Sequence, residues 1–165
     1  MFVGEKMATS QSQKYSISLS GEFFVTAELL RRGVMAAVTY GNAKKADVVA
    51  VSGSHAVKIE VKTSQTGRWA LGSSPPSAET APIWVLVRMP EDLNMPPRFH
   101  VLTAEDLLTA IAIRDVPFHQ RYRDKHGKEF EGRGVYNVVE AEIAAHAGRW
   151  DKITKLLPGQ DGKPK

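Results

Sequence analysis

Three ionisable residues, Asp47, Glu60 and Lys62, have the types and spacing that could do chemistry on a phosphodiester. Mg²⁺ prefers oxygen ligands, usually one or two carboxylates together with waters and phosphate oxygens. A cation held by the two acids could lower the pKa of a bound water and stabilise charge on the phosphate. The lysine could orient or deprotonate the attacking water, or offset the negative charge that builds up on the phosphate.

The element that must position these residues is a β-hairpin. Gly53-Ser54 is a two-residue turn signal between the strand-like runs DVVAVS and HAVKIEVKTS. The register that this turn sets places Asp47 opposite Glu60, with Cβ atoms about 4.5–5.5 Å apart, and Lys62 on the same face. The opposite face collects apolar side chains that can pack under a helix, namely Val48, Ala50, Val57, Ile59 and Val61.

Each member of this group also has a purely structural interpretation. Glu60 and Lys62 could be an ordinary surface ion pair, and Asp47 could belong to the turn that precedes its strand. Two carboxylates that face each other across strands destabilise a sheet, however, and a divalent cation between them reverses that cost. The opposed acids therefore favour a metal site.

Composition removes several other kinds of chemistry. The chain has 165 residues, 42% of them hydrophobic, which suffices for one domain with its own core. It contains no cysteine, so disulfides, zinc-thiolate sites, iron–sulfur clusters and thiol nucleophiles are excluded. Phosphate-loop, dinucleotide-binding and nucleophile-elbow motifs are absent, and the five histidines show no metal-ligand spacing.

Charge and hydropathy bear on partners and location. The net charge of +4 permits nucleic-acid binding without requiring it. The N-terminal stretch lacks the apolar core of a signal peptide, and no apolar run is long enough to span a bilayer. We therefore expect a cytoplasmic protein with no membrane partner.

Changes in composition, helix-capping residues and glycines predict three regions and two clear helices. Residues 1–17 are expected to be a flexible N-terminal arm, residues 18–157 a single domain and residues 158–165 a disordered tail. The first helix is expected after an N-cap at Ser20 and to end at Gly33, with Glu22 in its opening turn. Its apolar residues at helical spacing are Phe23, Phe24, Val25, Ala27 and Leu30. The second helix, over residues 104–113, follows a capping box made by Thr103 and Asp106.

The remaining segments are expected to build a sheet. Strands are predicted at residues 34–40, 47–52, 55–64, 83–89 and 98–102. Residues 64–82 are rich in Ser, Pro and Gly and are predicted to be a long, functional loop. Residues 114–134 have no clear period and could be an exposed hairpin or an insertion, and residues 138–157 have helical character with an interruption at Gly148. This order favours a mixed sheet with helices against it.

The layout of Glu22 in GEFFVTAELLRRG, Asp47 in KKADVVAV, and Glu60 with Lys62 in IEVKTS resembles the PD-(D/E)xK nuclease superfamily. That superfamily comprises restriction-endonuclease-like and Holliday-junction-resolvase-like enzymes, and the resemblance covers residues 18–103. It implies an α/β fold with a restriction-endonuclease-like core, in which helices flank a mixed central β-sheet. One departure is Ala46, which stands where the named motif has proline.

The resemblance also implies roles for individual residues. Asp47 and Glu60 would be ligands of Mg²⁺ or Mn²⁺, and the carbonyl of Val61 would be a further ligand. Lys62 would be the catalytic lysine and Glu22 an auxiliary acid near the metal. The function implied is that of a Mg-dependent endonuclease that hydrolyses phosphodiester bonds in DNA, with a homodimer as a further expectation.

Three residues after the motif are candidates for substrate binding. Gln65 stands where some branches of the superfamily place a polar site residue. Arg68 and Trp69 could hold a nucleic-acid strand by phosphate contact and base stacking, or Trp69 could anchor the loop on the core. The alternative function is a non-catalytic module on the same fold that binds nucleic acid or protein, and an RNA substrate is not distinguished from DNA.

Overall fold

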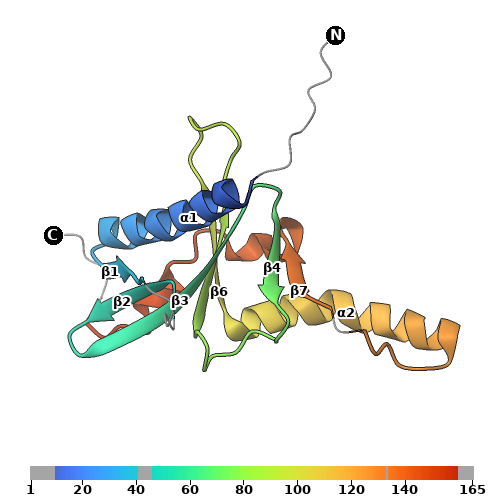
Figure 1. Cartoon of the computed structure of the whole chain (residues 1–165). Coiled ribbons are helices and arrows are strands. Elements are labelled where there is room, and N and C mark those ends of the chain that lie inside the picture. The colour runs from blue at the N-terminus through green and yellow to red at the C-terminus, as the bar shows by residue number, and fades with distance from the viewer. Residues whose placement is uncertain (1–9, 41–45, 133, 160–165) are drawn as a thin grey trace, which may run out of the picture.

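The computed structural model describes residues 10–40, 46–132 and 134–159. These residues form a five-stranded mixed sheet flanked by helices, together with a two-stranded sheet (Figure 1). The predicted α/β fold class is confirmed. In chain order the elements are α1 Gln11–Arg31, β1 Met35–Val38, β2 Val48–Ser52, β3 His55–Ser64, β4 Arg68–Gly72, β5 Ile83–Arg88, β6 Arg98–Thr103, α2 Ala104–His126, β7 Tyr136–Val139, the 3-10 helix η1 Glu140–His146 and α3 Asp151–Thr154.

The five-stranded sheet has the order β1-β2-β3-β5-β6. Its two central strands, β3 and β5, are parallel, and the other neighbours are antiparallel. The β2–β3 hairpin has the predicted register, since Ser52 pairs with His55 and Val48 pairs with Ile59. Gly53 has a φ of 56°, a value that few other residues adopt readily.

The central strand β3 changes partners along its length. Ile59 pairs with Val48 of β2 on one side and with Ile83 of β5 on the other. From Ile59 to Ser64 the strand pairs with β5, whereas its pairing with β2 stops at Ile59. The two strands thus diverge at this residue. Over residues 60–64, the edge of β3 that faces β2 has no strand partner in the sheet, and we call it the open edge.

Each face of the sheet has its own core. The first face is covered by α1 and α3, and Val25, Leu29 and Ile153 of these helices pack with Ile59 and Val61 of β3. The second face is covered by the β4–β7 sheet, α2 and η1, whose core residues include Trp69, Leu107 and Ile143. The apolar set that the sequence predicts on one side of the hairpin is therefore buried under α1, as expected. No helix in the described ranges is long and apolar enough to cross a membrane.

Helix α1 begins earlier than predicted. Its N-cap is Ser10, whose Oγ accepts from Gln13 N at 3.1 Å, so residues 11–17 are helical and the predicted arm is wrong there. Residues 11–16 are all exposed, which explains why the sequence shows no apolar period in these turns. Residues 1–9 and 160–165, which hold the rest of the predicted arm and most of the predicted tail, lie outside the described residues.

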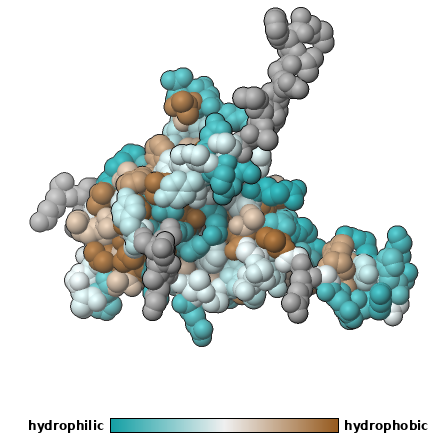
Figure 2. Space-filling view, in the orientation of Figure 1, coloured by the Kyte–Doolittle hydropathy of each residue, from teal (hydrophilic) through white to brown (hydrophobic). Residues whose placement is uncertain are grey.

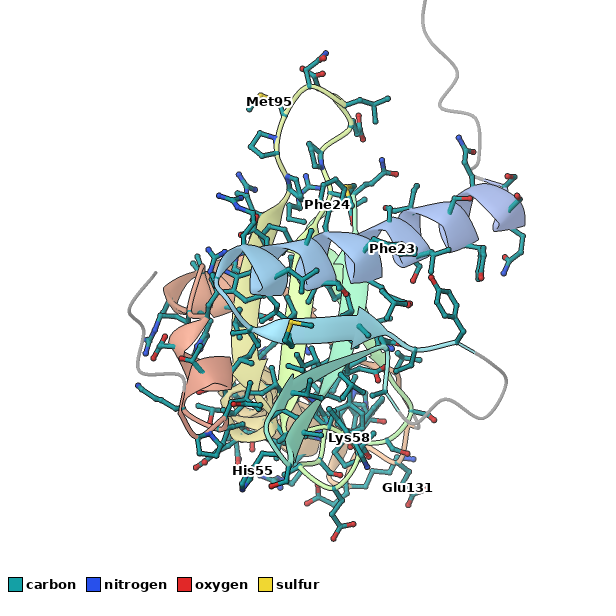
Figure 3. All side chains as sticks on the ribbon, turned by 90° about the vertical axis from the view of Figure 1, so that its left-hand side faces the viewer. Phe23, Phe24, His55, Lys58, Met95 and Glu131 are labelled. Carbon is teal, nitrogen blue, oxygen red and sulfur yellow. The ribbon has the colours of Figure 1, made fainter. Side chains whose placement is uncertain are left out.

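The buried side of α1 also differs from the predicted one. Its buried residues are Gly21, Glu22, Val25 and Leu29. Phe23 and Phe24 are 49% and 43% exposed. Figure 3 shows α1 crossing in front of the sheet, with these two phenylalanines labelled.

The predicted long loop at residues 64–82 contains the strand β4. Arg68 pairs with Val139 and Trp69 with Val138, so the partner strand lies about seventy residues farther along the chain. A partner so distant leaves no hairpin signal in the sequence. The signal in the sequence is the placement of the large apolar residues Trp69 and Leu71 at alternate positions. These two are buried in the structure, whereas Arg68 and Ala70 are exposed.

The C-terminal part of the chain differs from the prediction in two places. Helix α2 continues through Pro117 to His126, although residues 114–134 were expected to be irregular, and its predicted Thr103–Asp106 capping box is present. None of residues 114–126 is buried, which explains the missing period. The predicted helix at residues 138–157 is instead the end of β7 followed by η1 and α3, and Gly148, with a φ of 64°, interrupts it as expected.

Helix α1 lies close against β3 at Gly21. A Cβ on Gly21 would overlap Thr63 Oγ1 and would lie 3.1 Å from Thr63 Cβ. We expect Gly21→Ala to lower the free energy of unfolding by about 1–3 kcal/mol, since overpacking outweighs the gain in helix propensity. Chemical denaturation measures this change.

The matched control is Gly134→Ala, because a Cβ there meets no atom within 4 Å. Its free energy of unfolding should stay within about 0.5 kcal/mol of the parent. Adding Thr63→Ala to Gly21→Ala should restore stability. An unchanged or higher stability of Gly21→Ala alone would contradict the close packing of α1 on β3.

Candidate active site

Glu60 and Lys62 lie on the second face of β3, as predicted. They pair with Trp84 and Leu86 of β5, which belong to the core of that face. Lys62 Nζ is 2.6 Å from Glu60 Oε1, and the two side chains are 32% and 20% exposed. The Lys62 ammonium also lies 5.9 Å from the centre of the Trp84 ring. The pair is therefore partly desolvated by the core and still open to solvent.

Asp47 lies at the point where β2 leaves β3. It is only 7% exposed, and it immediately precedes Val48, which pairs with Ile59. The Val61 N–H donates to Asp47 Oδ2 at 2.9 Å, and the Asp47 N–H donates to the Ile59 carbonyl at 3.1 Å. The carboxylate of Asp47 thus satisfies a backbone donor of β3 that β2 no longer reaches.

The backbone pattern of β3 decides which groups face the open edge. Met89 N donates to the carbonyl of Ser64 at 2.9 Å, so the even-numbered residues of β3 direct their backbone groups toward β5. The N–H and C=O of one strand residue point to the same side. The carbonyl of Val61 therefore faces the open edge, on the side where its N–H meets Asp47.

Glu22 reaches the same stretch of β3 from the other face. It is 6% exposed on α1, next to Gly21, which lies against Thr63. Thr63 Oγ1 also donates to the carbonyl of Ser18 at 3.4 Å, which ties α1 to this end of β3. Glu22 and the Glu60–Lys62 pair therefore flank β3 from opposite faces.

The donor set suits a hard cation with an incomplete protein shell. Within the described ranges, no group of three or more His, Cys, Asp or Glu side chains could hold a metal ion. Asp47 and the carbonyl of Val61 lie at the open edge, and Glu60 lies on the second face at the residue before Val61. Mg²⁺ usually takes one or two carboxylates and keeps waters or phosphate oxygens as its other ligands. The residues present fit a site in which the protein supplies only part of the ligand shell.

Trp69 does not lie where the sequence hypothesis of base stacking requires. It is 1% exposed, its Nε1 donates to the Val87 carbonyl at 3.2 Å, and its ring lies 5.8 Å from that of His100. A base cannot stack on a ring that is enclosed on both sides by protein. Base stacking by Trp69 is therefore wrong, and the alternative, an anchor for its segment, describes its position.

Ser64 is a structural residue of this region that the sequence analysis missed. Its Oγ accepts from the N–H groups of Thr66 at 3.1 Å, Gly67 at 3.1 Å and Arg68 at 3.3 Å. The signal was a serine at the end of a strand followed three residues later by glycine, which is typical of a side-chain-capped turn. This turn carries the half-buried Gln65 and leads into β4, where Arg68 is exposed.

Glu140 of η1 supports the same turn and lies among charged residues of β5 and β6. Glu140 N donates to the Gly67 carbonyl at 2.9 Å, and its carboxylate lies 2.7 Å from Arg98 and 3.6 Å from Arg88. His100 lies 3.7 Å from the same carboxylate. Burial lowers the pKa of His100, although its hydrogen bond with the Leu86 backbone and the charge of Glu140 act to raise it. These contacts fix the chain that follows Lys62.

Comparison with known proteins gives similarities of structure. No protein-family model matches the sequence, and no curated protein is found to be similar to it. The structure is similar to a bacterial homing endonuclease, with a TM-score of 0.42 and 16% identity over 55% of this chain and 69% of that one. It is also similar to the Holliday junction resolvase Hjc of Archaeoglobus fulgidus, with a TM-score of 0.49 and 13% identity over 83% of this chain and 95% of that one. At these identities the two similarities concern the fold alone.

Two substitutions at Asp47 separate its structural contact from its charge. Asp47→Ala would leave the buried N–H of Val61 without its acceptor, and we expect the free energy of unfolding to fall by about 1–3 kcal/mol. Asp47→Asn keeps an oxygen acceptor at that position, so it should lose less than half as much. Urea denaturation of both variants measures the difference. Equal losses would show that the contact with Val61 does not stabilise the open edge.

Proposed function

We propose that this protein is a metal-dependent nuclease that hydrolyses phosphodiester bonds in DNA, with Mg²⁺ or Mn²⁺ as its cofactor. The observation that carries the proposal is that Asp47, Glu60 and Lys62 all make contacts within residues 60–62 of β3. Asp47 reaches the backbone of Val61, and Lys62 contacts Glu60. Glu60 and Lys62 belong to β3, and Asp47, which precedes β2, is hydrogen-bonded to the residue between them.

The acidic residues supply the ligands. Asp47, Glu60 and the Val61 carbonyl would hold the cation, with Glu22 as an auxiliary acid from the first face. When bound there, the cation would lower the pKa of a coordinated water and offset charge on the phosphate. Carboxylates held by a backbone hydrogen bond and by an ion pair need little reorganisation to take up a ligand.

Lys62 supplies the positive charge beside the reacting phosphate. Its ammonium is 2.6 Å from Glu60 Oε1, so it can donate to a water or a phosphate oxygen that lies next to this carboxylate. Gln65, in the turn directly after β3, would contact the substrate from the end of the same strand. The proposed homodimer and the cytoplasmic location stay predictions.

A second function, a non-catalytic module that binds nucleic acid or protein, is favoured by one observation. Both acids already have structural partners, because Asp47 accepts from Val61 and Glu60 pairs with Lys62. Such contacts could hold the open edge together without any cation. The two functions differ in whether DNA is cleaved when a divalent metal is added.

Cleavage of DNA in the presence of Mg²⁺ or Mn²⁺ tests the proposal. Supercoiled, branched and single-stranded substrates should be offered, since the sequence and fold do not choose among them. We expect Lys62→Ala to lower the rate of the cleaved substrate by about 10²- to 10⁴-fold, because it removes the charge beside the phosphate. The measurement is the initial rate of product formation on gels.

Lys58→Ala is the matched control for this experiment. Lys58 is an exposed residue of the same strand and, at a spacing of two, lies on the same face as Glu60. Its loss should leave the rate within about twofold of the parent, since it lies on the hairpin side of the site. Cleavage that persists equally in both variants, or that needs no divalent metal, would sink the proposal.

A further inference from the structure

The second half of α2 projects from the body of the protein. We define the arm as residues 114–132, which comprise this part of the helix and the segment that turns back after it. Figure 1 shows α2 extending away from the sheet, at the opposite end of the molecule from the β2–β3 hairpin. Its outer end is hydrophilic in Figure 2. This part of the helix is not buried against the rest of the protein, so its surface is accessible to a partner.

The returning segment of the arm is held in place by aromatic contacts. The ring of Phe130 lies 5.3 Å from that of Phe118 and 5.1 Å from that of Tyr122, both roughly edge to face. The helix ends at His126, and its C-cap Gly127 has a φ of 66°, in the left-handed region. Edge-to-face contacts are a favourable geometry for aromatic pairs. They hold the returning segment against the helix, so the arm has a defined shape outside the main core.

A groove runs between the arm and the β4–β7 sheet. It has a volume of about 1090 Å³, and its lining includes Arg68 of β4, Arg114, Phe118 and Arg121 of α2, and Tyr136 of β7. The groove therefore joins residues from three elements that are far apart in the sequence. Arg68 comes directly after the turn that follows β3. One end of the groove therefore lies next to the strand that carries Lys62.

Some of the arginine side chains in the groove have hydrogen-bond or ion-pair partners and others have none among the described residues. Arg114 donates to the carbonyl of Asn137 at 2.6 Å and pairs with Asp115 at 3.2 Å. Asp115 is the only acidic residue in the described part of the lining. Arg68 and Arg121 are exposed, and neither forms an ion pair with any described residue. The charge left over in the groove is therefore positive and comes from two guanidinium groups.

We propose that this groove binds the phosphodiester backbone of the nucleic acid, outside the metal site, through Arg68 and Arg121. The inference rests on the proposed function for its ligand class and adds the surface that holds the substrate. Guanidinium groups match phosphate oxygens in charge and hydrogen-bond geometry. Backbone contacts of this kind position a nucleic acid without reading its sequence.

The test is the affinity for a fluorescein-labelled DNA duplex, followed by fluorescence anisotropy in EDTA, which prevents metal-dependent cleavage. We expect the double variant Arg68→Gln/Arg121→Gln to raise the Kd about tenfold near 0.1 M salt. The slope of log Kd against log salt should decrease by about 2, since two phosphate contacts are lost. The variant Arg68→Lys/Arg121→Lys, which keeps both charges, should retain most of the affinity.

The matched control is Lys14→Gln/Lys58→Gln, which removes the same charge from exposed positions on α1 and β3. It should change the Kd by less than about twofold. Binding by the arginine-to-glutamine variant that equals this control, or a parent protein that does not bind the duplex, would overturn the inference. Because the assay needs no cleavage, weaker binding of that variant supports the groove even if the protein proves to have no nuclease activity.

Discussion

The divergence of β2 from β3 at Ile59 is the constraint on which the candidate site depends. Past this residue, β3 keeps its hydrogen bonds to β5 and loses its partner on the other side. A buried strand edge needs another acceptor for its N–H groups. Asp47 provides it for Val61, so the residue that completes the sheet is also the one that brings a carboxylate to the open edge.

Rigid elements support this edge on both faces. Gly21 allows α1 to lie against Thr63, which places Glu22 close to β3 on the first face. The Ser64-capped turn and Glu140 hold the chain that leaves β3 on the second face. Side chains carried by a central strand with such support are positioned more precisely than side chains on loops. The pairing of Asp47 with a backbone amide suggests that the site is shaped before any ligand binds.

The sequence predicted best where the chain's interactions are local. The Gly53-Ser54 turn determines the register of β2 and β3, and this register alone brings Asp47 next to the strand that carries Glu60. Strand β4 was missed because its partner, β7, is distant in the sequence, and the burial of Trp69 followed from that pairing. Periodicity also failed at the exposed turns of α1 and α2, since a helix without a buried side has no apolar period. Sequence patterns could not show that Glu22 approaches β3 from the face opposite to Glu60, because that depends on packing.

The most direct measurement of the central claim is the position of a bound metal. Crystals grown with Mn²⁺ allow the ion to be located by its anomalous scattering. We expect a peak beside the open edge of β3, about 2.1 Å from a carboxylate oxygen of both Asp47 and Glu60, with the remaining positions filled by water or phosphate oxygens. An ion bound elsewhere, or none at this edge while Lys62 remains paired with Glu60, would contradict it.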